Sequence, residues 1–156
     1  ISGYAGLTSL KLDSRLQMKK ELSTGNVTSL IKTIKGLFAG IPWRNFTNND
    51  LANSEGYYAS VLYAFFASIN AQVIPEDITN HGQADMTIIF RNHIYVIEIK
   101  VVDNLPEGNN QALQQIVQRK YAEKYRNREG ISVHEVGLVF NKTERNLVQA
   151  DYVTAP

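Results

Sequence analysis

Residues 82–102 read GQADMTIIFRNHIYVIEIKVV, and this stretch decides which fold is expected. It contains two runs rich in Ile, Val and other apolar residues, at 84–90 and 93–102, separated by Arg91-Asn92. Short apolar runs with many β-branched residues on either side of a tight turn are typical of strands, so the stretch predicts a β-hairpin. A loop of either two or four residues centred on that turn gives the same register.

That register brings three charged side chains to one face of the hairpin. Asp85 lies directly opposite Glu98, where Cβ atoms are about 4.5–5.5 Å apart, so the carboxylates repel each other unless a cation lies between them. Hard carboxylate oxygens suit Mg²⁺ or Mn²⁺. Lys100 shares the face with Glu98 because side chains alternate along a strand. The opposite face is apolar and consists of Met86, Ile88, Phe90, Tyr95, Ile97 and Ile99.

The patterns on either side of the hairpin predict helices and further strands. A helix before the last strand allows a right-handed parallel crossover, so we expect an α/β (mixed α+β) protein with a central mixed four-stranded sheet flanked by helices. The expected elements are a helix over 26–39, a helix over about 50–69, strands over 72–79, 84–90 and 93–102, a helix from Asn109 or Asn110 to about Arg128, and a strand over 133–141, followed by a weak strand or a tail.

Length and composition limit the possible classes of protein. The 156 residues suit one core, and we expect residues 1–45 to form a helical extension or connector before a domain over 46–156. No apolar run reaches the roughly 18 residues of a membrane span, and no cysteine is present, which fits a cytoplasmic protein with no membrane partner. The chain begins at Ile1, so we expect it to be part of a longer protein.

Two polar residues fall on apolar helix faces. Glu55 lies within the predicted stripe of Leu51, Tyr58, Leu62, Phe65 and Ile69, where an unpaired carboxylate is costly. It could reach the same cation as Asp85 and Glu98, directly or through a water molecule, or it could pair with a base such as Lys100. Gln115 lies at the margin of the buried face of the later helix.

Each charged group also has an ordinary structural interpretation. Asp85 could be a turn residue at a strand start, and Glu98 and Lys100 could be solvent-facing residues of an edge strand. Arg119, Lys120 and Lys124 belong to a basic run that is usually a solvated helix face, although it could also contact phosphates. The joint occurrence of the carboxylates and the lysine in a strand rich in Ile and Val favours a polar site.

Several motifs together resemble the PD-(D/E)XK nuclease superfamily. The similarity is greatest to the C-terminal nuclease-like domain of bacterial proteins that begin with a predicted AAA-type ATPase domain, and it covers about residues 50–141. The matching segments are Gly82-Gln83-Ala84-Asp85, Tyr95-Val96-Ile97-Glu98-Ile99-Lys100, Ala112-Leu113-Gln114-Gln115-Ile116 and Lys120-Tyr121.

The resemblance implies a restriction-endonuclease-like core in the order αβββαβ and a set of roles. Asp85, Glu98 and the Ile99 carbonyl would bind Mg²⁺ or Mn²⁺, with Glu55 as an outer ligand. Lys100 would orient or activate the attacking water, and Gln115 would help to hold the site. The implied function is an endo- or exonuclease acting on nucleic acid, with DNA favoured over RNA.

The resemblance also leaves alternative functions open. The family often has Gly-Arg-x-Asp where this chain has Gln83, which removes one cation near the scissile phosphate. The alternatives are therefore a nuclease-like module that binds nucleic acid without cleaving it, and a module that regulates an ATPase domain of the same longer chain.

Overall fold

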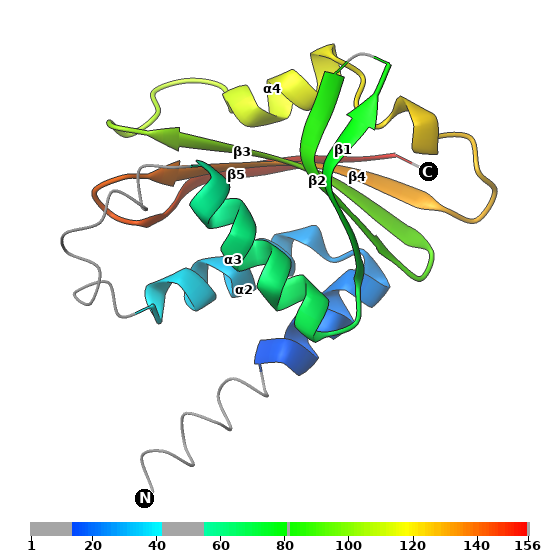
Figure 1. The fold of residues 1–156 in the computed structure, drawn as a ribbon, viewed down its shortest axis with the longest axis horizontal. Coiled ribbons are helices and arrows are strands. Elements are labelled where there is room, and N and C mark those ends of the chain that lie inside the picture. Colours follow the sequence, from blue (N-terminus) through cyan, green and yellow to red (C-terminus); the bar gives the residue numbers. More distant parts are fainter. Residues whose placement is uncertain (1–13, 42–54, 81, 156) are drawn as a thin grey trace, which may run out of the picture.

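A single mixed sheet organises the part of the chain that the computed structural model describes, residues 14–41, 55–80 and 82–155 (Figure 1). Five strands lie in the order β1-β2-β3-β4-β5. Their bounds are β1 Gln72–Thr79, β2 Gly82–Phe90, β3 His93–Val102, β4 Ser132–Asn141 and β5 Asn146–Ala155. The α/β class and the mixed sheet predicted from the sequence are confirmed.

The hairpin between β2 and β3 has the register that was predicted from the sequence. Phe90 pairs with His93, and the antiparallel ladder continues to Met86 paired with Ile97. Arg91 in the turn has a φ of 54°, the left-handed conformation that tight hairpin turns require. Asp85 is the next residue along β2, just beyond the last pair of this ladder.

The predicted count of four strands is wrong, because the C-terminal residues form β5 antiparallel to β4. The predicted parallel pairing is present between β3 and β4, which run side by side along their full lengths. Within β5 only Leu147 is buried, so the strand lacks the alternating apolar pattern that marks a half-buried strand. It is an exposed edge strand held by backbone pairing.

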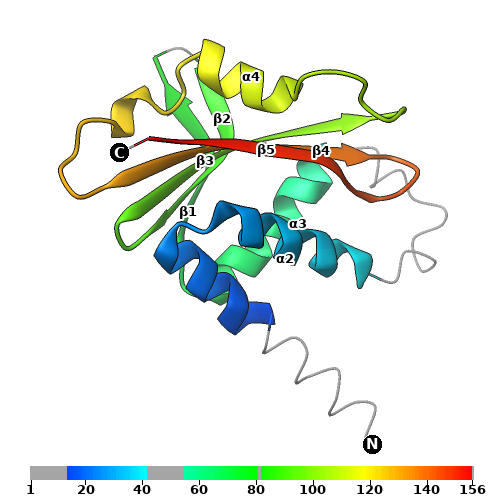
Figure 2. The same ribbon diagram turned by 180° about the vertical axis from the view of Figure 1, so that it is seen from behind.

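The two faces of the sheet carry different helices (Figure 2). The helix over residues 14–24, α2 (Val27–Ala39) and α3 (Glu55–Ser68) cover one face, and α4 (Gln111–Gln118) covers the other. The Asn26 side chain accepts the Ser29 N–H and so caps α2, which lies within the predicted range of 26–39. The larger core includes Met18, Leu30, Tyr58, Ile97 and Phe140. Residues 14–41 thus share a core with the sheet, while the predicted boundary between residues 45 and 46 lies outside the described residues.

The prediction that the helix after β3 continues to about Arg128 is also wrong. The helix ends at the C-cap Arg119, and Lys120 adopts a φ of 53°. The Tyr121 N–H then donates to the Ile116 carbonyl (3.1 Å) and the Lys120 N–H to the Val117 carbonyl (3.3 Å), which is a Schellman motif. Glycine normally occupies the left-handed position of this motif, so the sequence contains no evident stop signal.

A buried carboxylate fixes the segment after α4 to the sheet. Asp77 in β1 is 3% exposed and accepts hydrogen bonds from Thr87, Lys124 and Tyr125, the last within the 3₁₀ turn η3 (Glu123–Tyr125). Burial alone would raise the pKa of Asp77, but the hydrogen bonds from Lys124, Tyr125 and Thr87 outweigh it and lower the pKa. This network sets the position of the chain beyond the Schellman motif.

Membrane insertion through helices finds no support in this fold. Among the described residues, no helix combines the length and the apolar character needed to cross a bilayer.

Candidate active site

Two carboxyl groups meet where β2 separates from β3. The Asp85 N–H donates to Glu98 Oε2 (3.3 Å), and the Ile99 N–H donates to Asp85 Oδ2 (2.6 Å). Side-chain oxygens thus replace the backbone carbonyls that would continue the ladder beyond Met86 and Ile97. The reciprocal hydrogen bonds hold both carboxyl groups on the same part of the sheet, close to the arrangement that the register predicted.

Burial and mutual repulsion govern the ionisation of this pair. Glu98 is 4% exposed, and burial together with the charge of Asp85 raises the pKa of Glu98 to about 8. Burial also raises the pKa of Asp85, although the hydrogen bond from the Ile99 N–H opposes this effect. Among the ion pairs of the described residues, none includes either carboxylate. Near neutral pH the pair therefore keeps a proton, which a bound cation would displace.

Lys100 supplies positive charge to the pair. It follows Glu98 by two residues on β3, so both side chains leave the same face of the sheet. The charge of Lys100 lowers the pKa of both Asp85 and Glu98, but less than burial raises it. Lys100 is partly exposed and lines an adjoining cleft, which places its ammonium group at the boundary between the buried pair and solvent.

Gln115 contacts the site directly from α4. Its Nε2 donates to Glu98 Oε1 (3.0 Å) and approaches the hydroxyl oxygen of Tyr121 (3.3 Å). Tyr121 is 2% exposed and packs against Gly82 at the start of β2, so it closes the far side of the amide. Sequence analysis gave Tyr121 no separate role, because it placed this residue inside a longer helix.

The close approach of α4 to the sheet depends on a glycine. Gly137 of β4 pairs with Glu98 of β3, and a Cβ at position 137 would meet the backbone N of Leu113 and lie 2.7 Å from Asn110 Oδ1. The buried Asn110 caps α4 by accepting the Leu113 N–H (2.9 Å) and donates from Nδ2 to the Gly137 carbonyl (3.0 Å). Asn110 thus joins β4 to the start of α4, the helix that carries Gln115.

Comparison with known proteins agrees with this geometry. Residues 53–150, more than half of the chain, match the family model of the PD-(D/E)XK nuclease superfamily. This chain belongs to that superfamily. It is also 47% identical over 111 residues to an uncharacterized protein in the vnfD 5′ region of Azotobacter chroococcum mcd 1. The match covers 71% of this chain and 21% of the relative, so the chain spans about a fifth of that relative's length.

In this PD-(D/E)XK protein, the predicted position of Glu55 on a buried face is wrong. Glu55 is exposed at the first turn of α3, whose buried residues are Tyr58, Leu62 and Phe66. The buried stripe of α3 is therefore rotated about the helix axis from the predicted stripe. The helix α3 packs on the face of the sheet opposite the face that α4 covers. A role for Glu55 as an outer metal ligand stays a prediction. Leu51, which the same stripe included, lies outside the described residues.

Glu76 is an acidic neighbour that sequence analysis missed. It has a φ of 49° and is exposed, and its charge raises the pKa of Asp85. The signal that could have identified it is the regular β1–β2 register, in which Asp77 pairs with Ala84, so that Glu76 comes opposite Asp85.

The donor set of this superfamily member fits a divalent cation. Among the described residues, no group of three or more Asp, Glu, His or Cys side chains converges on one point. The candidate ligands are therefore two carboxylates, Asp85 and Glu98, with the predicted Ile99 carbonyl. Mg²⁺ is commonly bound through one or two carboxylates plus waters and substrate phosphates, so a pair of neighbouring carboxyl groups fits this pattern. Superfamily nucleases usually use divalent metals.

The three predicted nucleic-acid-binding cations have different surroundings. Arg119 and Lys120 are exposed at the end of α4. Lys124 is also exposed, but its Nζ donates to Asp77 Oδ1 (2.6 Å) and to the Ile78 carbonyl (2.9 Å). The ammonium group of Lys124 is thus part of the network that fixes η3, and a phosphate would compete with Asp77 for it.

Lys120 has a left-handed backbone conformation (φ 53°), which is strained for a residue other than glycine and destabilises the end of α4. We expect Lys120→Gly to stabilise the protein by about 1 kcal/mol, because the left-handed backbone is strained for every residue with a Cβ. If Lys120 binds a phosphate, the same change weakens DNA binding and reduces the salt dependence by about one counterion. Thermal unfolding and salt-titrated DNA binding measure the two effects.

A second substitution separates charge from backbone strain at this position. Lys120→Ala removes the charge but keeps the Cβ, so we expect it to weaken DNA binding as much as Lys120→Gly without the gain in stability. Unchanged DNA affinity in both variants would show that Lys120 does not contact the nucleic acid.

Proposed function

We propose that this protein is a metal-dependent nuclease that hydrolyses phosphodiester bonds in DNA or RNA, with DNA favoured. The observation that carries the proposal is the pairing of the partly buried Asp85 with the buried Glu98 beside Lys100, in a chain of the PD-(D/E)XK superfamily. Two adjacent carboxyl groups, whose mutual repulsion and burial raise the pKa of Glu98, form a site that would release its proton and be stabilised when Mg²⁺ or Mn²⁺ binds.

Each residue of the site would have a distinct role in hydrolysis. A divalent cation held by Asp85 and Glu98, with the Ile99 carbonyl as a further ligand, would supply Lewis-acid chemistry to the phosphate and the attacking water. Gln115 holds the Glu98 carboxylate in place through its amide. Lys100 would orient the water and stabilise the negative charge that develops on the phosphate oxygens. One P–O bond forms to the water oxygen, one ester P–O bond breaks, and the leaving oxygen takes a proton.

A cleavage assay with purified protein tests this proposal. We expect labelled DNA to be cut in Mg²⁺ or Mn²⁺ and to remain intact in EDTA, with Lys100→Met reducing the rate by about 10²–10³-fold. Lys32→Met is the matched control, because Lys32 is exposed on α2, which covers the face of the sheet opposite the site. Equal cleavage by the wild type and Lys100→Met would identify a contaminating nuclease and refute the site.

A second candidate is a module that binds nucleic acid without hydrolysing it. Gln83 favours it, because this exposed residue occupies a position two before Asp85 where the superfamily often has Arg. Substitution of Gln83 by Arg distinguishes the two functions. A gain of cleavage from an inactive wild type supports the binding module, whereas a wild type that already cleaves supports the nuclease.

We further propose that the domain works together with an ATPase domain of a longer chain. The chain corresponds to about a fifth of the Azotobacter relative, which leaves room for such a domain. ATP hydrolysis by the full-length protein, and its change when DNA is added, tests this association. No ATPase activity in the full-length protein would refute it.

A further inference from the structure

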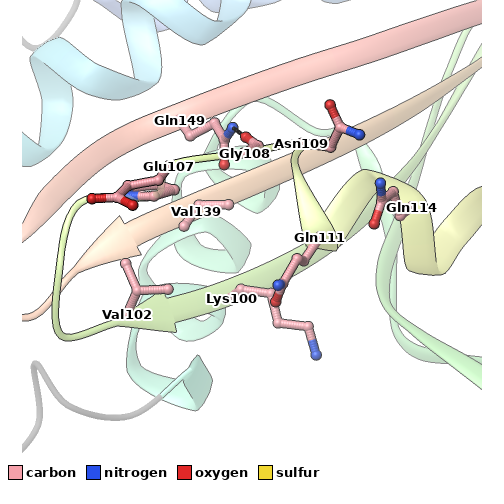
Figure 3. Close-up of a pocket in the computed structure, with 10 residues that line it drawn as sticks. Lys100, Val102, Glu107, Gly108, Asn109, Gln111, Gln114, Val139 and Gln149 are labelled. Atoms are coloured by element: carbon pink, nitrogen blue, oxygen red, sulfur yellow. Dashed lines mark hydrogen bonds between the residues drawn. The ribbon is translucent and has the colours of Figure 1, made fainter.

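A cleft of about 330 Å³ adjoins the carboxylate site at Lys100 (Figure 3). Val102 of β3 and Val139 of β4 contribute apolar side chains from the sheet, and Gln111 and Gln114 face it from α4. Glu98 and Lys100 are two residues apart on β3, a separation of about 6.6 Å along a strand. A ligand in the cleft would therefore lie next to the group that is bound at the carboxylates.

The lining of the cleft is rich in amides and has little net charge. Asn109 and Gln149 add two more side-chain amides, and the only charged residues among those that line it are Lys100 and Glu107, which have opposite signs. A phosphate group would call for several cations or a bidentate arginine. Amides around an apolar surface instead suit a neutral ligand with apolar faces and hydrogen-bonding edges.

The walls of the cleft are held in place by hydrogen bonds within the protein. Gln149 Nε2 of β5 donates to the carbonyl of Gly108 (2.8 Å), which fixes the loop before α4 (Figure 3). Asn110, 5% exposed, ties the start of α4 to Gly137 and also donates to Asp151 Oδ2 (3.1 Å). The amides of Gln111 and Gln114 therefore project from a helix whose position is already set, which reduces the entropy lost on binding.

We propose that this cleft binds one unpaired nucleobase next to the scissile phosphate, so that the substrate is single-stranded or locally unpaired nucleic acid. The proposal rests on the nuclease or nucleic-acid-binding function proposed above and deepens it. Asparagine and glutamine amides form paired hydrogen bonds with base edges. A base within a duplex has its pairing edge occupied and must leave the stack before such a pocket can take it. The volume is at the lower end of small-molecule sites, which suits one nucleotide and not a duplex.

Binding measured without catalysis tests the inference. Fluorescence anisotropy in EDTA would compare single-stranded DNA, single-stranded RNA and duplex DNA of one sequence. We expect single strands to bind roughly tenfold more tightly than the duplex, and Gln111→Ala and Gln114→Ala each to weaken single-strand binding by roughly five- to tenfold. Gln118→Ala is the matched control, since Gln118 is exposed on the same helix and does not line the cleft.

The outcomes separate this inference from the proposed hydrolysis. Tight single-strand binding that depends on Gln111 and Gln114, with no cleavage in any metal, would refute hydrolysis and support the base pocket. Equal affinity for duplex and single strands, no binding of any strand, or equal effects of Gln111→Ala and Gln118→Ala would overturn the base pocket, even if the protein cleaves DNA. The DNA and RNA arms show which single strand supplies the base.

Discussion

Replacing Glu98 with glutamine is expected to abolish cleavage and to stabilise the metal-free fold. Loss of this carboxylate removes one of the two charged ligands, and the resulting loss of several kcal/mol in transition-state stabilisation corresponds to roughly 10³-fold in rate. The same change removes a buried charge beside Asp85, so the metal-free variant should melt at a higher temperature than the wild type at alkaline pH. Cleavage rates and melting curves in EDTA measure both effects.

The dependence of stability on pH follows from the direction of the Glu98 shift. Burial and the charge of Asp85 raise the folded pKa of Glu98 to about 8, from an ordinary value of 4.5. Between these values the folded protein keeps a proton that the unfolded chain has released. Stability in EDTA therefore falls as pH rises from about 4.5 to about 8, with a slope of at most about 1.4 kcal/mol per pH unit for one proton. Glu98→Gln should flatten this slope.

Metal binding tests the role of Glu98 as a ligand without requiring catalytic turnover. Mn²⁺ should raise the melting temperature of the wild type, because a ligand that binds the folded state alone stabilises it, and this increase should be absent in Glu98→Gln. Glu129→Gln is the control, since Glu129 is exposed. An equal Mn²⁺-dependent increase in both variants would contradict the assignment of Glu98 as a ligand, whatever the cleavage assay shows.

The hairpin could be predicted because local patterns determine it. The turn at Arg91-Asn92 fixes the register of β2 and β3, and the register brings Asp85 to Glu98. Sequence patterns could not show that the ladder ends at Met86, which lets each carboxyl group accept a backbone N–H from the other strand. That detail depends on how β2 diverges from β3 across the whole sheet.

The errors arise at positions where the local sequence pattern does not determine the structure. β5 contains apolar residues that do not alternate regularly with polar ones, and it is held by its pairing with β4, so its sequence pattern gives only a weak strand signal. The end of α4 is a Schellman motif with Lys120 at the position where glycine is expected. Glu55 was placed from helical spacing alone, and a small rotation of the buried stripe of α3 leaves it exposed.

Gly137→Ala is expected to have the largest effect on stability, because no side chain fits between β4 and α4 at this position. A Cβ there would meet the backbone N of Leu113 and would lie 2.8 Å from the Cα of Leu113. Backbone atoms cannot turn aside as a flexible side chain can, so α4 must move. Overpacking of this kind costs roughly 3 kcal/mol, which denaturant unfolding measures directly.

The displacement of α4 by Gly137→Ala should also reach the active site. Gln115 lies on α4 and holds Glu98, the residue that pairs with Gly137 in the sheet, so we expect metal affinity to fall by about 10–100-fold. Gly36→Ala is the matched control, because nothing lies within 4 Å of a Cβ at that position in α2. The control should gain roughly 0.5–1 kcal/mol from higher helix propensity and leave metal affinity unchanged. If Gly137→Ala retains both stability and metal affinity, the contact between α4 and β4 does not position the site, and the link from sheet register to catalysis fails at this residue.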